Sequence, residues 1–150
     1  YLLQAIDTEF KRAKAMRASL SILFLDLDHF KKINDTHGHA AGDYVLKEFA
    51  NLVKTSFVRP RDLFARYGGE EFVLMLSNTS ADAGMAIGEK IRAAVEGHAF
   101  IFEGKKIPVT SSLGIAEISE AYATADAFLA AADGALYQSK QNGRNRITRA

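Results

Sequence analysis

The 150-residue chain contains no cysteine, which excludes both a disulfide framework and a thiolate-bound metal site. It also lacks an excess charge of one sign. The formal net charge is +1, so no broad basic field attracts nucleic acid, and an anionic ligand must be met by locally placed groups. The longest apolar runs are far too short to span a bilayer, and the N-terminus has no signal-peptide pattern. We therefore expect a cytoplasmic protein with no membrane segment in this chain and no nucleic-acid partner.

The residues that are present suit one domain, residues 1–150. Apolar residues make up 48% of the chain and charged residues 25%, as in ordinary soluble globular proteins, and the length allows a sizeable core. Only two prolines, Pro60 and Pro108, interrupt it.

A β-hairpin is predicted in the middle of the chain. Residues 62–67 alternate apolar and polar side chains, and residues 72–76 are almost wholly apolar. The Gly68–Gly69 pair between them favours a tight two-residue turn, because glycine reaches positive φ at no steric cost.

Four carboxylates lie where predicted strands end or turn. Glu70 and Glu71 leave the glycine turn and point to opposite faces of the strand, so we expect them to have different roles. Upstream, the buried-strand pattern of residues 22–25 ends in Asp26 and Asp28. Acids at these two places can converge on Mg²⁺, which one or two carboxylates usually hold together with substrate phosphates. The alternatives are solvated acids at a hairpin tip and aspartates that cap the next segment.

Periodicity predicts an α+β fold with a central antiparallel sheet flanked by helices. His37 and His39 are interpreted as turn residues and not as metal ligands, because no third ligand lies nearby. Helices are expected over residues 1–18, 42–57, 82–95 and 126–141. Further strands are expected over residues 100–102 and 106–109, joined at Glu103–Gly104, and over residues 110–118 and 147–148.

Five blocks stand in order along the chain: DLDHFKKINDTHGHAAGDYVL (residues 26–46), RPRD (59–62), RYGGEEF (66–72), TSSLGIA (110–116) and ADGALYQSKQNGRNR (132–146). Together they resemble the GGDEF domain, the catalytic domain of diguanylate cyclases, in its GGEEF form. The resemblance implies a ferredoxin-like, palm-type nucleotidyl cyclase fold. The family carries a D-x-LTGLxNR segment just before the first helix, so the resemblance also implies an N-terminally truncated domain with a regulatory domain upstream.

The resemblance implies that two GTP molecules, one on each domain of a homodimer, condense into cyclic di-GMP. It assigns catalysis to Asp26, Glu70 and Glu71, and it leaves open which glutamate is the base. The implied cofactor is Mg²⁺, with Mn²⁺ as an alternative, bound by Asp26, the Leu27 carbonyl and Glu70.

The resemblance further assigns Asn34 and Asp43 to guanine recognition and Arg59 with Asp62 to an inhibitory cyclic di-GMP site. From the residues alone, three alternatives remain: Asn34 lies in a turn, Asp43 lies at a helix N-terminus, and Arg59 and Asp62 form a surface ion pair. The remaining substrate-binding residues implied are His29, Phe30, Lys31, Gly69, Lys140 and Arg144.

Two other function classes remain open from the sequence. One is a catalytically silent domain that binds GTP or cyclic di-GMP and signals through contacts. The other is a cyclase with relaxed base choice, against which Asp43 argues because adenine lacks the donor pair that a carboxylate accepts.

Overall fold

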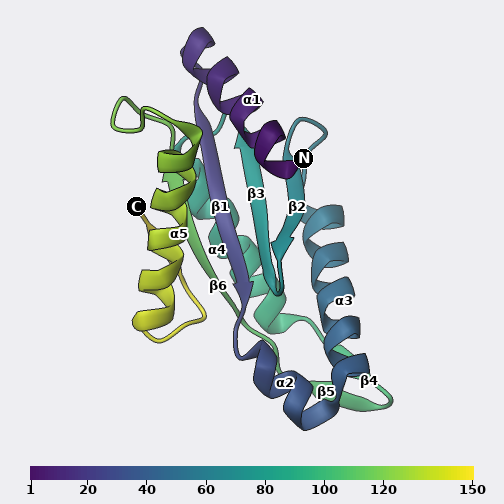
Figure 1. Cartoon of the computed structure of the whole chain (residues 1–150). Helices are drawn as coiled ribbons and strands as arrows, with labels where there is room; N and C mark the ends of the chain where they lie inside the picture. Colours follow the sequence, from purple (N-terminus) through teal and green to yellow (C-terminus); the bar gives the residue numbers. More distant parts are fainter.

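The computed structural model describes residues 1–150 and places a five-stranded sheet at the centre of the molecule (Figure 1). No helix has the length and apolar character needed to cross a membrane. The elements in chain order are α1 (Leu2–Met16), β1 (Leu20–Leu27), α2 (Phe30–His37), α3 (His39–Phe57), β2 (Leu63–Gly68), β3 (Glu71–Ser77), α4 (Ala81–Gly97), β4 (Phe100–Phe102), β5 (Lys105–Ile107), β6 (Ser111–Glu117), α5 (Ala125–Gln141) and β7 (Ile147–Arg149).

The α+β class is confirmed, with one correction to the predicted sheet. The strand order is β2-β3-β1-β6-β7, and β4 with β5 forms a separate hairpin. Neighbouring strands among β2, β3, β1 and β6 are antiparallel as predicted, but β7 runs parallel to β6. The reason is that α5 is a crossover connection, which returns the chain to the end of the sheet where β6 began. The sheet is therefore mixed.

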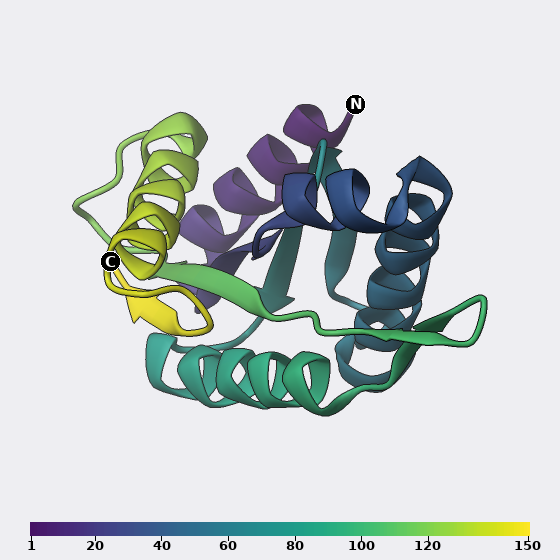
Figure 2. The same ribbon diagram turned by 90° about the horizontal axis from the view of Figure 1, so that it is seen from below.

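The central strand β1 is buried along its whole length because helices cover both faces of the sheet. Leu23 and Leu25 pack with residues of α3 and α4, whereas Ile22 and Phe24 pack with residues of α1 and α5. Figure 2 shows α1 and α5 on one side of the sheet and α4 on the other. Side chains alternate along a strand, so Asp26 falls on the face that α5 covers.

The segment after β1 differs from the prediction. Residues 30–37 form α2, which periodicity did not predict, and α3 begins at His39 and not at Gly42. The short helix α2 buries only Ile33 and so shows no repeating apolar pattern. Gly38, with φ of 93°, separates the two helices. His37 and His39 were predicted to be turn residues, but they are the last residue of α2 and the first residue of α3.

The central hairpin forms, but its turn lies one residue later than predicted. Gly68 pairs with Glu71, so the two turn residues are Gly69 and Glu70, after an irregularity in the pairing at Tyr67. Of the two glycines, only Gly69 has a positive φ, 50°. The second hairpin turns at Glu103–Gly104 as predicted.

The helix α5 lies unusually close to β6. A Cβ atom on Gly114 would lie 2.1 Å from the Leu136 backbone nitrogen and 2.4 Å from the Ala132 carbonyl oxygen. Thr124 caps the start of the helix by accepting a hydrogen bond from the Ala127 amide at 3.1 Å. The close contact fixes the height of α5 above the sheet and thus the position of its last turn.

Candidate functional site

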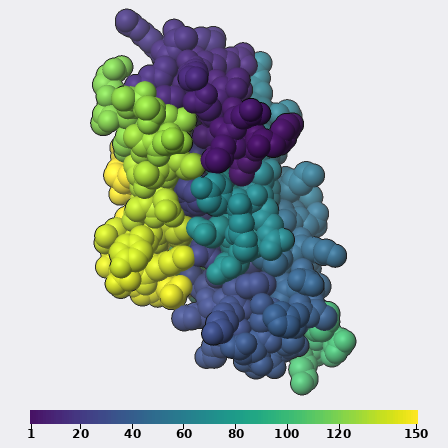
Figure 3. Space-filling view, in the orientation of Figure 1, coloured from purple at the N-terminus to yellow at the C-terminus, as the bar shows by residue number.

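The end of β1 lies beside the turn between β2 and β3, and three acidic residues are located there. Asp26 is directly opposite Glu71 in the antiparallel pair, so both side chains lie on the same face. The Leu27 amide donates a hydrogen bond to the Glu70 carbonyl at 3.4 Å, which brings Glu70 to the same strand end. We call Asp26, Glu70 and Glu71 the acidic cluster. In Figure 3 the teal surface of the β2–β3 hairpin lies between the yellow α5 and the blue α2.

α5 contributes both a positive and a negative charge to this region. Lys140, in the last turn, forms an ion pair with Asp26. Asp133 is exposed, and its negative charge acts on Glu71. Seven residues are about two helical turns, which places Asp133 and Lys140 on one face of the helix. Asp133 was not among the predicted site residues, although its seven-residue spacing from Lys140 is a signal that the sequence contains.

The surroundings of Asp26 and Glu71 favour the protonated forms of these two carboxyl groups. Burial raises the pKa of Asp26 to about 6; Lys140 opposes this shift, and the charges of Glu70 and Glu71 reinforce it. Burial also raises the pKa of Glu71, opposed by Lys140 and reinforced by Asp133 and Glu70. An added cation would favour the ionised forms of these carboxyl groups.

The acidic cluster fits a divalent cation in one specific respect. Asp26 Oδ1 is buried and has no hydrogen-bond partner, and an unsatisfied buried carboxylate oxygen is costly. No group of three or more His, Asp or Glu side chains is arranged to hold a metal ion. The inferred ligands, Asp26, the Leu27 carbonyl and Glu70, include only two carboxylates. Such a set suits Mg²⁺, which usually keeps waters or takes substrate phosphate oxygens as its other ligands.

Replacing Asp26 with asparagine is expected to stabilise the metal-free protein at pH 7. The pKa of Asp26 is raised from 3.8 to about 6 on folding, so its contribution to stability is fully present below about pH 4 and is lost as the pH rises through about 6. The loss in the free energy of unfolding amounts to at most about 3 kcal/mol. The asparagine side chain of the variant avoids this loss because it carries no charge to bury. Urea unfolding with a chelator at pH 4.5 and pH 7 measures the effect.

Asp35→Asn is the matched control, since Asp35 is exposed on α2. Asp26→Asn should unfold at a higher urea concentration than the wild type at pH 7 and show a smaller pH dependence. A variant that is less stable than the wild type at pH 7 would contradict the raised pKa of Asp26.

Asn34 and Asp43 lie on two helices that pack against each other. Asn34 is part of α2, and its Oδ1 is buried without a hydrogen-bond partner. Asp43 is exposed on α3. Gly42 lies against Asn34, since a Cβ atom there would be 1.8 Å from Asn34 Oδ1. Asn34 is therefore helical and not in a turn, and the absence of a side chain at Gly42 makes room for it.

The start of α2 follows the acidic cluster directly. His29 has a left-handed backbone, with φ of 55°, and precedes the first helical residue, Phe30. The first amides of a helix have no intrahelical acceptor, so those of Phe30 and Lys31 are available to an anion. His29 and Lys31 are exposed.

Asp28 does not join the acidic cluster. Its buried carboxylate accepts hydrogen bonds from Thr110 Oγ1 at 2.8 Å and Ser112 Oγ at 2.6 Å. Arg144 Nη1 lies 3.8 Å from Asp28 Oδ1. The sequence left open whether Asp28 is a cation ligand or a cap; in the structure it binds residues around the start of β6 and after α5.

Arg59 and Asp62 bind each other in a network at the other end of the sheet. Arg59 Nε and Nη2 each donate to the Asp62 carboxylate at 2.9 Å, and the Ser77 amide donates to it at 3.2 Å. The Asp62 side chain is inaccessible to solvent, whereas that of Arg59 is 52% exposed. Burial acts to raise the pKa of Asp62, but the hydrogen bonds from Arg59 and Ser77 lower it overall. The ion-pair alternative is thus present, and Arg59 Nη2 also donates to the Ser77 carbonyl at 2.8 Å and to Thr79 Oγ1 at 3.0 Å.

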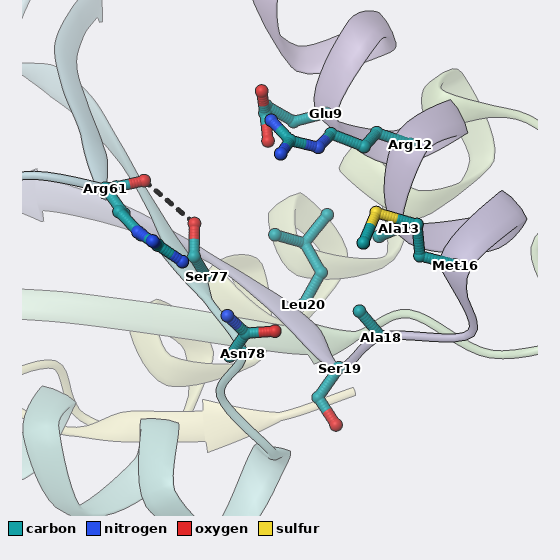
Figure 4. A pocket seen from close by; sticks show the side chains of 10 residues that line it. All are labelled: Glu9, Arg12, Ala13, Met16, Ala18, Ser19, Leu20, Arg61, Ser77 and Asn78. Carbon is teal, nitrogen blue, oxygen red and sulfur yellow. Dashed lines mark hydrogen bonds between the residues drawn. The ribbon is translucent and has the colours of Figure 1, made fainter.

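A pocket of about 410 Å³ lies beside this network, between α1 and the end of β3 (Figure 4). Its lining includes Arg12, Arg61 and Ser77, and Ser77 Oγ donates to the Arg61 carbonyl at 2.8 Å. Leu20 also lines it, at the end of β1 opposite to Asp26. A strand of this length spans about 20 Å, so the pocket is separate from the acidic cluster.

Comparison with known proteins identifies the family. The profile described as "Diguanylate cyclase, GGDEF domain" matches residues 1–146. "Diguanylate cyclase A" of Treponema denticola is 54% identical over 132 residues, which are 88% of this chain and 35% of that protein. "Response regulator PleD" of Caulobacter vibrioides is 42% identical over 149 residues, which are 98% of this chain and 33% of that protein. The chain thus spans about a third of the length of these curated relatives.

Solved structures agree with this identification. The GGDEF domain of DgcB from Caulobacter crescentus, in complex with c-di-GMP, superimposes with a TM-score of 0.92 at 32% identity, covering 97% of this chain and 86% of that one. The active GGEEF domain of a diguanylate cyclase from Vibrio cholerae gives 0.91 at 32% identity, covering 99% and 93%. The chain therefore belongs to the GGDEF domain family of diguanylate cyclases.

Proposed function

We propose that this domain condenses two GTP molecules into cyclic di-GMP with release of two pyrophosphates. The observation that carries the proposal is the buried Asp26, which has an unpartnered oxygen and lies opposite Glu71 and close to Glu70. Such a site suits a cation that bridges protein carboxylates and a polyphosphate. The names of the relatives, and the c-di-GMP in the DgcB structure, support the same reaction.

In the proposed reaction, each ribose 3′-oxygen forms a bond to the α-phosphorus of the other GTP. The bond from that phosphorus to the oxygen bridging to the β-phosphate breaks, and pyrophosphate leaves. The hydroxyl proton passes to Glu70 or Glu71, and the raised pKa of Glu71 suits an acceptor. Asp26, the Leu27 carbonyl and Glu70 would hold Mg²⁺ or Mn²⁺, which when bound neutralises phosphate charge and acidifies the hydroxyl.

The phosphates would be bound by groups around the acidic cluster. The Phe30 and Lys31 amides at the start of α2 can donate to phosphate oxygens, and the turn glycine Gly69 lets a ligand approach the backbone closely. Lys140 and Arg144 supply positive charge from the end of α5 and the turn after it. These groups position the substrate and offset its charge, which is the main task of a protein in phosphoryl transfer.

Guanine recognition is proposed for Asn34 and Asp43, with Gly42 making room for the Asn34 side chain. We expect Gly42→Ala to weaken GTP binding about tenfold, because the new Cβ would displace Asn34 and the loss of one or two hydrogen bonds has this size. Calorimetric titration with GTP measures it. Gly134→Ala in α5 is the control, since its Cβ meets nothing within 4 Å. Equal affinity in the two variants would contradict a role for Asn34.

We also propose that the reaction needs a homodimer, because each domain would supply one GTP, and that a regulatory domain controls it.

The proposed conversion of GTP into cyclic di-GMP is tested by incubating the protein with Mg²⁺ and either GTP or ATP and separating the nucleotides by chromatography. GTP should give cyclic di-GMP and pyrophosphate, and ATP should give neither product. Turnover of ATP at a similar rate would contradict guanine selectivity and favour a cyclase with relaxed base choice.

Product inhibition is proposed at Arg59 and Asp62, remote from the acidic cluster. Arg59→Ala is expected to raise the cyclic di-GMP concentration needed for half-inhibition at least about tenfold, since a guanidinium that binds phosphate or a guanine edge contributes on this scale. Inhibition assays at a fixed GTP concentration measure it, with Lys54→Ala on an exposed part of α3 as the control for lost charge. Unchanged inhibition in Arg59→Ala would contradict the assignment.

A further inference from the structure

The turn between α5 and β7 holds three successive residues in a left-handed conformation. The φ angles are 117° at Gly143, 66° at Arg144 and 46° at Asn145. Glycine reaches this region freely and asparagine tolerates it, but an arginine there costs about 1–2 kcal/mol. A glycine at position 144 would remove this cost. Strained residues of this kind persist only where the surrounding structure holds them, and they cluster at functional sites.

One side of this turn is attached to the strand that ends at the acidic cluster. The backbone N–H of Asn145 donates a hydrogen bond to Asp28 Oδ2 at 3.0 Å. Arg144 Nη1 lies 3.8 Å from Asp28 Oδ1. The Asp28 side chain is only 1% exposed and is fixed by the Thr110 and Ser112 hydroxyls. Asp28 therefore binds the peptide group that follows Arg144, and its carboxylate lies within ion-pair distance of the Arg144 guanidinium.

The other side of the turn is attached to α4, at the back of the sheet (Figure 2). Asn145 Oδ1 accepts from Arg92 Nη1 at 2.9 Å, and Asn145 Nδ2 donates to Glu96 Oε2 at 2.8 Å. Arg92 is itself 17% exposed and is held by Glu89 and Glu96 through three further hydrogen bonds of 2.7 to 3.0 Å. Both polar atoms of the Asn145 side chain, Oδ1 and Nδ2, are thus hydrogen-bonded to residues of α4.

From this geometry we propose that Asn145 is a positioning residue for nucleotide binding: held between Asp28 and Arg92, it fixes the left-handed turn that presents Arg144 to the substrate phosphates. The proposal rests on the proposed function, in which Arg144 contacts phosphate. Asn145 does not touch the substrate and acts only through Arg144. α4 thereby contributes to nucleotide affinity although it lies on the face of the sheet opposite to the acidic cluster.

The test combines Asn145→Gly with Arg144→Ala in a double-mutant cycle. Glycine reaches the left-handed φ freely and keeps the backbone donor to Asp28, so Asn145→Gly removes only the contacts to α4. The dissociation constant of a non-hydrolysable GTP analogue with Mg²⁺ is measured by calorimetry. We expect Asn145→Gly to weaken binding about tenfold in the wild-type background and less than about twofold in the Arg144→Ala background. Asn142→Gly, at an exposed position just before the turn, is the matched control.

Amide hydrogen exchange in the free protein provides a readout independent of the ligand. Residues 144–146 should exchange faster in Asn145→Gly than in the wild type, with melting temperatures within a few degrees of each other. Wild-type affinity in Asn145→Gly, or equal losses in both backgrounds, would overturn the inference alone. Failure of the wild-type protein to bind the GTP analogue would overturn the proposed function and with it this inference.

Discussion

Replacing Glu70 with glutamine is expected to reduce the rate of cyclic di-GMP formation by about 10³-fold. Glu70 is the turn residue whose backbone lies against Leu27 and whose charge acts on Asp26. Its amide counterpart keeps the size of the side chain but removes the negative charge, and with it a proposed metal ligand and candidate base. Losing a group that stabilises charge or accepts a proton in the transition state typically has an effect of this size. Steady-state rates with GTP and Mg²⁺ measure it.

Glu120→Gln is the control, since Glu120 is an exposed residue before α5. It should retain the wild-type rate, and both variants should unfold at similar temperatures. Glu71→Gln tests the neighbouring carboxylate in the same way. If Glu70→Gln kept more than about a tenth of the wild-type rate, Glu70 would not have the role proposed here.

Replacing Gly114 with alanine is expected to lower the free energy of unfolding by more than about 3 kcal/mol. The added Cβ would lie 2.1 Å from the Leu136 amide nitrogen and 2.4 Å from the Ala132 carbonyl oxygen. Both are backbone atoms in the middle of α5, which cannot move aside as the end of a side chain can. The whole helix would have to shift from the sheet, and disruption of a packed core on this scale is at the severe end of single substitutions. Urea unfolding measures the loss.

Gly68→Ala is the matched control, a strand glycine whose Cβ would meet nothing within 4 Å. Its stability should stay within about 1 kcal/mol of the wild type. Because α5 carries Lys140, any folded Gly114→Ala protein should also bind GTP more weakly. A Gly114→Ala variant as stable as Gly68→Ala would show that the helix can lift from β6 at little cost.

Local patterns in the sequence were sufficient to predict most of the fold. β1 is an apolar run ending in acids, α5 ends just before Gly143, and both hairpins have glycine in the turn. α2 was missed because it buries only Ile33. The direction of β7 depends on where α5 returns the chain, which no local pattern encodes.

The part of the candidate site that lies at the ends of the predicted strands could be predicted from the sequence. Asp26 and Glu71 lie opposite each other because β1 pairs with β3, and both ends were visible in the sequence. The contact between Asp28 and Asn145 could not be predicted, since the hydrogen bond that joins them links residues 117 positions apart. Gly42 was missed for a similar reason: its close contact with Asn34 exists only once α2 and α3 pack together.

The most direct test of the cyclase proposal is the initial rate of cyclic di-GMP formation from saturating GTP and Mg²⁺ over a wide range of protein concentrations. If two domains each supply one GTP, the rate per protein molecule should rise with concentration until dimers predominate, and Glu70→Gln should be almost inactive throughout. A rate strictly proportional to concentration would contradict the requirement for two domains. GTP binding without product at any concentration would contradict the cyclase proposal and favour a GTP-binding signalling domain.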